Sequence, residues 1–235
     1  MQLFYSPNIQ NNTIRIEDEE FHHLKVLRKA VGSELAVTDG KGNLFSARIT
    51  EIAKHHCLAE IENTTHVEPP THQLHVVVAP TKNIDRIEWL VEKLTEIGVA
   101  KISFIQCTHS ERKVLKTERL NKIALSAMKQ SLQFYLPQLN ELQTFDDFIK
   151  ATPQNTNLFM GYCETENTQH LLSQPFTYQN SVILIGPEGD FSPAEVQAAQ
   201  KAGFEAISLG ANRLRTETAA MVAATLINAK FEVNP

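Results

Sequence analysis

The sequence predicts an α/β protein in two parts, a small β-rich domain followed by a larger domain built on a mostly parallel sheet. Three observations predict this. Short segments that alternate apolar and polar residues dominate the first seventy residues. Two adjacent prolines then interrupt the chain in the segment Glu68-Pro69-Pro70-Thr71. Beyond them, short β-type runs alternate with helical patterns, which is typical of a parallel sheet covered by helices on both faces.

The N-terminal part, residues 1–70, is expected to form a small barrel or curled sheet. Its predicted strands cover residues 12–16, 34–38, 44–49 and 57–61. One helix is expected at residues 19–27, because Phe21, Leu24 and Leu27 form a single apolar stripe. Between two of the strands, Asp39-Gly40-Lys41-Gly42-Asn43 has the residue types of a tight hairpin turn.

The C-terminal part, residues 71–235, follows the segment 68–71, which we expect to be a linker because prolines end strand pairing and stiffen the chain. Its predicted strands cover residues 74–79, 102–106, 158–162, 182–185 and 206–209. Its predicted helices cover residues 84–97, 116–131, 146–151, 193–202 and 216–231.

The composition excludes several classes of protein. Hydrophobic residues make up 42% and charged residues 21% of the 235 residues, which excludes a wholly disordered chain. The net charge of −5 argues against a protein that coats nucleic acid without specificity. The longest apolar runs, 74–80 and 182–185, are too short to cross a bilayer, and residues 1–8 show no pattern of a secretory signal.

The cysteines and histidines predict no disulfide framework and no metal site. The three cysteines are widely spaced and form no C-x-x-C pair: Cys57, Cys107 and Cys163. We interpret them as reduced core thiols of a cytoplasmic protein. The adjacent pairs His22-His23 and His55-His56 have no third ligand at metal spacing, so no metal is expected.

A glycine-rich loop follows the predicted strand at residues 182–185. It runs Ile185-Gly186-Pro187-Glu188-Gly189-Asp190-Phe191-Ser192, and Ser192-Pro193-Ala194-Glu195 then fits a capping box that begins a helix. Glycines at the carboxyl end of a strand let a ligand approach the backbone, where open α/β sheets bind ligands. A well-made turn explains the capping residues equally well. The loop is neither G-x-G-x-x-G nor Walker A, so it indicates neither a dinucleotide nor a nucleoside triphosphate.

A second loop places two arginines directly before a helix. It runs Leu209-Gly210-Ala211-Asn212-Arg213-Leu214-Arg215-Thr216-Glu217-Thr218. Thr216 and Glu217 are ordinary residues for a helix N-terminus. The arginines are not, because cations there face the positive end of the helix dipole. Since charges that break local rules are often functional, we interpret Arg213 and Arg215 as site residues.

Together, these two loops resemble the SPOUT superfamily of RNA methyltransferases, and specifically the bacterial RsmE family. Three further segments agree with that family: His22-His23-Leu24-Lys25-Val26-Leu27-Arg28 with its PUA-like RNA-binding domain, Glu92-Lys93-Leu94-Thr95-Glu96-Ile97-Gly98-Val99 with its K-x-x-E-L-G-V helix end, and Gln130-Ser131 with Pro137. The chain departs from the family at Asp190, which replaces a glycine, at Gln133, which replaces an arginine, and at Asn212-Arg213, which replaces Arg-Ile.

The resemblance implies a fold, a cofactor and a substrate. It implies a PUA-like RNA-binding β-barrel domain at residues 1–70 and a SPOUT methyltransferase domain with a trefoil knot at residues 71–235. It implies a homodimer with each active site near the interface. It further implies that S-adenosylmethionine (SAM) is the cofactor and that the enzyme methylates N3 of a uridine in 16S ribosomal RNA of the small subunit, with no metal and no membrane.

Site residues follow from the resemblance and from the chemistry. The expected cofactor-binding residues are Gly161, Ile185, Gly186, Glu188, Gly189, Leu209, Gly210, Leu214, Thr216 and Thr218. The expected RNA-binding residues are His22, His23, Lys25, Arg28, Lys129 and Gln130. For catalysis we expect Arg215 to stabilise the negative charge that develops on the uracil ring as N3 loses its proton. Glu217 is expected to orient that arginine, to help remove the proton, or only to cap the helix, and Arg213 is the alternative arginine.

Two alternatives stay open from the sequence. The first is a SPOUT methyltransferase with another RNA target, such as a ribose 2′-hydroxyl. The second is an RNA-binding protein without catalysis.

Overall fold

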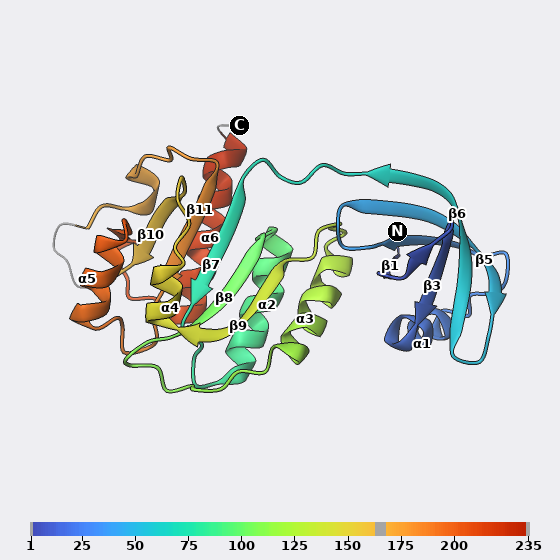
Figure 1. Cartoon of the computed structure of the whole chain (residues 1–235), viewed down its shortest axis with the longest axis horizontal. Coiled ribbons are helices and arrows are strands. Elements are labelled where there is room, and N and C mark those ends of the chain that lie inside the picture. Colours follow the sequence, from blue (N-terminus) through green and yellow to red (C-terminus); the bar gives the residue numbers. More distant parts are fainter. Residues whose placement is uncertain (1, 163–167, 234–235) are drawn as a thin grey trace. The chain divides into compact units, whose positions relative to one another are not determined.

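The structure is a computed structural model that describes residues 2–162 and 168–233, and it divides the chain into two compact units (Figure 1). Unit 1 comprises Met1–Pro69 with Leu125–Leu136, and unit 2 comprises Pro70–Ala124 with Pro137–Pro235. The first division falls within the expected linker. The inclusion of residues 125–136 in unit 1 is a feature that the sequence pattern does not predict.

Unit 1 contains one six-stranded sheet in the order β1-β4-β5-β6-β3-β2. Its strands are β1 (Leu3–Tyr5), β2 (Ile9–Gln10), β3 (Thr13–Glu17), β4 (Glu34–Thr38), β5 (Asn43–Ile52) and β6 (His56–His66). All neighbours pair antiparallel except β1 and β4. The two edge strands, β1 and β2, are joined by residues 6–8, a connection that spans at most about 14 Å. The sheet must therefore curl until its edges approach each other, in agreement with the predicted small barrel.

Helix α1 (Asp18–Val26) packs on this sheet. Its Phe21 and Leu24 are buried in one core with Phe4, Ile16 and Val37. The apolar stripe that predicts the helix is therefore the face that it buries, except that Leu27 follows the last helical turn and stays partly exposed.

Residues 125–136 join unit 1 through the last turns of α3 (Thr117–Gln130) and the chain that follows it. Lys129 forms an ion pair with Glu20 of α1. The Tyr135 hydroxyl donates a hydrogen bond to the Val67 carbonyl at 2.8 Å.

The predicted turn at residues 39–43 lies against this segment. Gly42 has a φ of +92°, a conformation that favours glycine. A Cβ atom on Gly42 would stand 2.2 Å from the Tyr135 hydroxyl oxygen and 2.8 Å from the Val67 carbonyl oxygen. The glycine is therefore required both by the turn and by the close approach of the 125–136 segment.

Unit 2 contains a second six-stranded sheet, in the order β12-β10-β11-β7-β8-β9. Its strands are β7 (Gln73–Val78), β8 (Lys101–Gln106), β9 (Gln138–Thr144), β10 (Asn157–Gly161), β11 (Asn180–Ile185) and β12 (Glu205–Ile207). All neighbouring pairs are parallel, as predicted. The sequence pattern missed β9, because this edge strand is half-exposed and lacks an apolar run.

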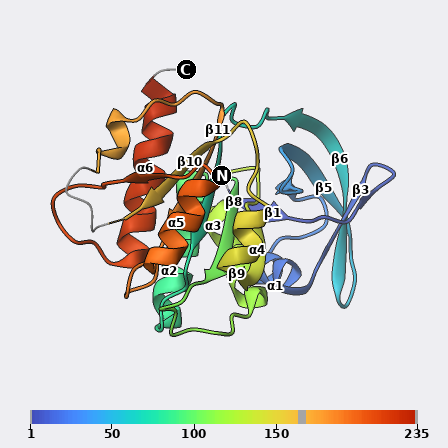
Figure 2. The same cartoon turned by 60° about the vertical axis from the view of Figure 1, so that its left-hand side comes forward.

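Helices cover both faces of this sheet (Figure 2). They are α2 (Ile84–Ile97), α4 (Phe145–Lys150), α5 (Pro193–Lys201) and α6 (Thr216–Val233), with a short 3₁₀ helix at Leu171–Ser173. Helices α4 and α5 contact each other and share a core with Val77, whereas α2 contacts α6, and α6 packs on β7 and β11. Val76 and Val78, the neighbours of Val77, are fully buried and point to the opposite face. The doubly covered parallel sheet is confirmed, and the trefoil knot stays a prediction.

Two of the three cysteines lie within the described residues. Cys57 and Cys107 are free and buried, as predicted for core thiols, and burial raises the pKa of the Cys57 thiol to about 11. Cys163 lies outside the described residues. Among residues 2–162 and 168–233, no helix is long and apolar enough to cross a membrane, and no three metal-ligating side chains gather into a group.

Candidate functional site

The two loops singled out by the sequence lie at the carboxyl edge of the sheet in unit 2. Loop 186–192 follows β11, and loop 208–215 follows β12. Strand β10 lies between these two strands and ends at Gly161, which is in register with Ile185 on one side and Ile207 on the other. The fold therefore brings the ends of three strands to one place, the edge at which open α/β sheets bind ligands.

Thr216 joins the two loops. It is buried at the first position of α6, and its Oγ1 donates a hydrogen bond to the Gly186 carbonyl at 3.0 Å. Gly186 in turn lies against Phe191, since a Cβ atom on it would stand 3.1 Å from that ring. The start of α6 is thus fixed to the end of β11.

Arg213 and Arg215 are exposed at this junction. Neither guanidinium has an ion-pair partner among the residues that the structure describes. Gly210, with a φ of +129°, has no heavy atom of the described residues within 4 Å of the place a Cβ would take. Leu209 and Leu214 are half-buried beside it. Two cations without an ion-pair partner among the described residues therefore lie beside an apolar surface.

Glu217 is the buried charge of the site. Its side chain is 9% exposed, and its Oε1 lies 3.6 Å from Nε of Arg86, in the first turn of α2. Its Oε2 is buried without a hydrogen-bond partner among the described residues. The ion pair of Glu217 is therefore with Arg86 and not with Arg215. Arg86 has no distinguishing signal in the sequence, because it lies in an ordinary amphipathic helix far from the loop, and only the packing of α2 against α6 reveals it.

Loop 186–192 is held from the other side by the segments after β7 and β8. The Lys82 N–H donates to Oε1 of Glu188 at 3.3 Å. His109 Nδ1 lies 3.0 Å from the carbonyl oxygens of both Gly189 and Asp190. Asp190 has a φ of +59°, which explains why the RsmE pattern has glycine at this position. Here the aspartate fits because its Oδ1 accepts the Phe191 N–H at 2.8 Å, a local bond that stabilises the turn.

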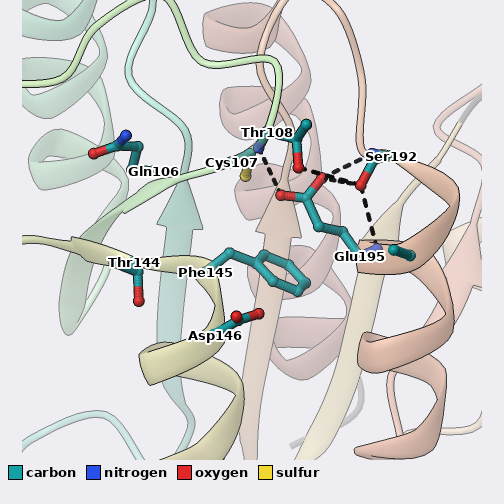
Figure 3. Close-up of a pocket in the computed structure, with 9 residues that line it drawn as sticks. Gln106, Cys107, Thr108, Thr144, Phe145, Asp146, Ser192 and Glu195 are labelled. Carbon is teal, nitrogen blue, oxygen red and sulfur yellow. Dashed lines mark hydrogen bonds between the residues drawn. The ribbon is translucent and has the colours of Figure 1, made fainter.

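The predicted capping box is present and borders a pocket of about 410 Å³ (Figure 3). Figure 3 shows the Glu195 carboxylate between Thr108 and Ser192. Its Oε1 accepts the Thr108 N–H at 2.7 Å, and its Oε2 accepts the Ser192 N–H at 2.7 Å and hydroxyl at 2.8 Å. The hydrogen-bonding capacity of Glu195 is therefore used in fixing loop 186–192 to the end of β8.

The predicted RNA-binding residues all lie in unit 1. His22, Lys25, Arg28 and Gln130 are exposed, and His23 is half-buried beside Gln2. The Lys25 ammonium lies over the Phe21 ring at 4.2 Å from its centroid. Lys129 differs from the other cations, since its charge is paired with Glu20 inside the unit. The exposed cations of this set are thus Lys25 and Arg28.

Both parts of the chain match known protein families. A family model described as an RNA methyltransferase domain matches residues 67–228, and one described as an RNA methyltransferase PUA domain matches residues 16–62. Two curated relatives are both named ribosomal RNA small subunit methyltransferase E. The Rickettsia conorii relative is 28% identical over 91% of this chain and 88% of its own length, and the Buchnera aphidicola relative is 29% identical over 92% and 87%.

Solved structures of ribosomal RNA methyltransferases are also similar to this chain. A probable rRNA-methyltransferase from Porphyromonas gingivalis is 39% identical, with a TM-score of 0.92 over 100% of both chains. A ribosomal RNA small subunit methyltransferase E from Neisseria gonorrhoeae, solved bound to S-adenosyl methionine, is 28% identical, with a TM-score of 0.86 over 97% of both chains.

Proposed function

Because the chain belongs to the RsmE-type RNA methyltransferase family, we propose that it is a SAM-dependent enzyme that methylates N3 of a uridine in 16S ribosomal RNA. Its relatives are named for the small ribosomal subunit, and one of them binds SAM in its solved structure. We place the enzyme in the cytoplasm with that RNA. One observation carries the proposal: two arginines that have no ion-pair partner in the described part of the chain, and a buried carboxylate, gather where the loops after β11 and β12 meet.

The residues at this junction fit SAM. The half-buried Leu209 and Leu214 offer apolar surface, and no described heavy atom lies within 4 Å of the place a Cβ on Gly210 would take. The other expected cofactor residues on loop 186–192 are Gly186, Glu188 and Gly189, and these offer mainly backbone groups. When bound, SAM supplies an electrophilic methyl group.

The side chains of the site prepare the uridine for this methyl group. The N3 lone pair becomes available only as the N3 proton leaves, and the ring carbonyls then gain negative charge. Arg215 would stabilise that charge by donating to a ring carbonyl oxygen. Glu217 would accept the proton at Oε2, the oxygen that has no partner in the described structure. Because N3 belongs to the Watson–Crick edge, the uridine must be unpaired or flipped out of its helix.

A calorimetric titration with SAM separates this function from the alternative of an RNA-binding protein without catalysis. The proposal expects the purified full chain to bind SAM with a saturable heat. An absence of binding by the folded chain would favour the alternative. The other alternative, methylation of a ribose 2′-hydroxyl, is separated by the chemical identity of the product.

We expect substitution of the exposed cations of unit 1 to weaken RNA binding. Lys25→Ala and Arg28→Ala should each lower the affinity for small-subunit RNA and flatten its dependence on salt, because fewer counterions are released when fewer phosphates are neutralised. Fluorescence anisotropy at several salt concentrations measures both effects. Arg48→Ala is the matched control, because the Arg48 guanidinium is already paired with Glu34 and Glu62. Equal losses of RNA affinity in all three variants, or a parallel loss of SAM affinity, would contradict the assignment of Lys25 and Arg28 to RNA binding.

We also propose that the enzyme is a homodimer that buries part of α6. Ile227 is fully buried within the single chain, but Met221 and Leu226 stay half-exposed, and Trp89 on the adjacent α2 is 39% exposed. These side chains are apolar surface of the kind that a second copy covers. Sedimentation velocity at micromolar concentration should show a dimer. A monomer with full activity at that concentration would refute the proposal.

A further inference from the structure

Helices α2 and α6 lie side by side and run parallel. At their beginnings, Arg86 contacts Glu217. Equally far along both helices, the Asn228 side chain donates a hydrogen bond to the Ile97 carbonyl at 2.9 Å. Both N-termini therefore meet at the carboxyl edge of the sheet, next to the loop that carries Arg215. The positive ends of two helix dipoles favour a negative charge at this place.

Glu217 lacks the backbone hydrogen bonds of a helix-capping carboxylate among the described residues. Among the described residues, no backbone N–H donates to either of its carboxylate oxygens. Its only partner there is Arg86, at 3.6 Å from Oε1, while Oε2 is buried without one. Burying a carboxylate is costly unless hydrogen bonds and opposite charge compensate it. An arrangement that places a cation beside one oxygen and leaves the other buried without a donor is expected where a ligand brings the donor.

We propose that Arg86 is a positioning residue of the methyl-transfer site. It holds Glu217 at Oε1 and leaves Oε2, which is buried without a donor among the described residues, to receive the N3 proton of the bound uracil. This inference rests on the proposed function and adds a residue that acts through Glu217. Arg86 suits the role because its side chain is 36% exposed: one side reaches the carboxylate while the other stays in solvent, which limits the cost of burying the pair.

The step is balanced without any further reactant. The N3–H bond breaks and its proton goes to Oε2 of Glu217. The N3 electron pair forms the bond to the methyl carbon, and the electron pair of the broken carbon–sulfur bond stays on sulfur. Glu217 then releases its proton to water and returns to the carboxylate that Arg86 stabilises.

A double-mutant cycle with Arg86→Ala and Glu217→Gln tests the inference. We expect Arg86→Ala to lower the single-turnover rate about ten- to a hundredfold, because a misplaced catalytic group loses that much. The affinities for SAM and for RNA should stay within about twofold, since Arg86 contacts neither in this scheme. In the Glu217→Gln background, Arg86→Ala should have no further effect on the rate. Arg86→Lys should keep most of the rate, because a lysine ammonium can also pair with Oε1 of Glu217.

Two measurements complete the test. The matched control is Lys150→Ala, which removes a cation 3.9 Å from Asp147 on the surface of the same unit and should leave the rate unchanged. The midpoint temperature of unfolding, measured without any ligand, should fall for Arg86→Ala and fall less in the Glu217→Gln background, because no unpaired carboxylate remains.

The outcomes separate the inference from the function on which it rests. Equal rate losses from Arg86→Ala in both backgrounds would show that Arg86 acts independently of Glu217 and would overturn the inference. Loss of SAM or RNA affinity at an unchanged rate would make Arg86 a binding residue and would also overturn it. If the wild-type chain methylates no RNA, the proposed function is refuted. The unfolding temperatures of the variants still measure whether Arg86 and Glu217 interact.

Discussion

Replacing Arg215 with alanine should lower the rate of methyl transfer by about a hundred- to a thousandfold, the typical loss when one donor to a developing negative charge is removed. The guanidinium is exposed at the start of α6 and has no ion-pair partner among the described residues, so it is available to a ring carbonyl oxygen. SAM affinity should change far less, because we expect loop backbone and apolar side chains to carry most of that contact. Single-turnover rates at saturating SAM measure the effect.

Three comparisons sharpen this test. Arg215→Lys should restore the rate only in part, because an ammonium cannot form the bidentate fork of a guanidinium. A higher pH should partly restore the alanine variant, because more of the uridine then loses its N3 proton to solvent. Arg213→Ala is the matched variant on the same loop and should lower the rate of methyl transfer less than Arg215→Ala does. If Arg215→Ala binds SAM poorly but transfers methyl at the normal rate once saturated, Arg215 is a cofactor clamp, and the catalytic role passes to Arg213 or Glu217.

Replacing Gly42 with alanine should destabilise unit 1 by roughly 3 kcal/mol, since it combines a left-handed backbone with overpacking. The new Cβ would stand 2.2 Å from the Tyr135 hydroxyl oxygen and 2.8 Å from the Val67 carbonyl oxygen, so the 125–136 segment would have to move. RNA affinity should fall as unit 1 is destabilised, whereas SAM affinity, which we assign to unit 2, should change little. Urea unfolding and calorimetry measure the two effects.

Gly32 provides the control for this variant. Its φ is +88°, but no heavy atom lies within 4 Å of the place its Cβ would take. Gly32→Ala should therefore lower the free energy of unfolding only by the backbone strain, about 1–2 kcal/mol. Equal destabilisation by the two substitutions would show that the contact with residues 125–136 contributes nothing.

Most helices and strands follow directly from local patterns. The amphipathic period predicts α2 at its observed bounds, and the apolar runs of unit 2 predict five of its strands. The missed strands all lie at sheet edges. Strands β1 and β2 have only three and two residues, too few to show a period, and β9 is half-exposed and lacks an apolar run. The assignment of residues 125–136 to unit 1 depends on tertiary contacts such as that of Tyr135 with Val67.

The arginines of the candidate site stand out in the sequence only because they contradict local rules. Arginines at a helix N-terminus stand out in a sequence, and they lead to Arg213 and Arg215. Arg86 gives no such signal, since a single arginine in an amphipathic helix is ordinary. Lys129 shows the reverse case: the sequence suggests an RNA contact, but the structure pairs its charge with Glu20. Whether a cation is available to a ligand depends on its partner in the fold, which local sequence does not encode.

The central claim is that this chain methylates N3 of a uridine in 16S ribosomal RNA, and one measurement tests it directly. Small subunits from a bacterial strain that lacks its own enzyme are incubated with SAM and the purified chain, and the 16S RNA is then digested to nucleosides for mass spectrometry. The account predicts that 3-methyluridine appears with the wild-type chain and is nearly absent with Arg215→Ala. A methyl group on a ribose 2′-hydroxyl, or no methylated nucleoside from a chain that binds SAM, would contradict it.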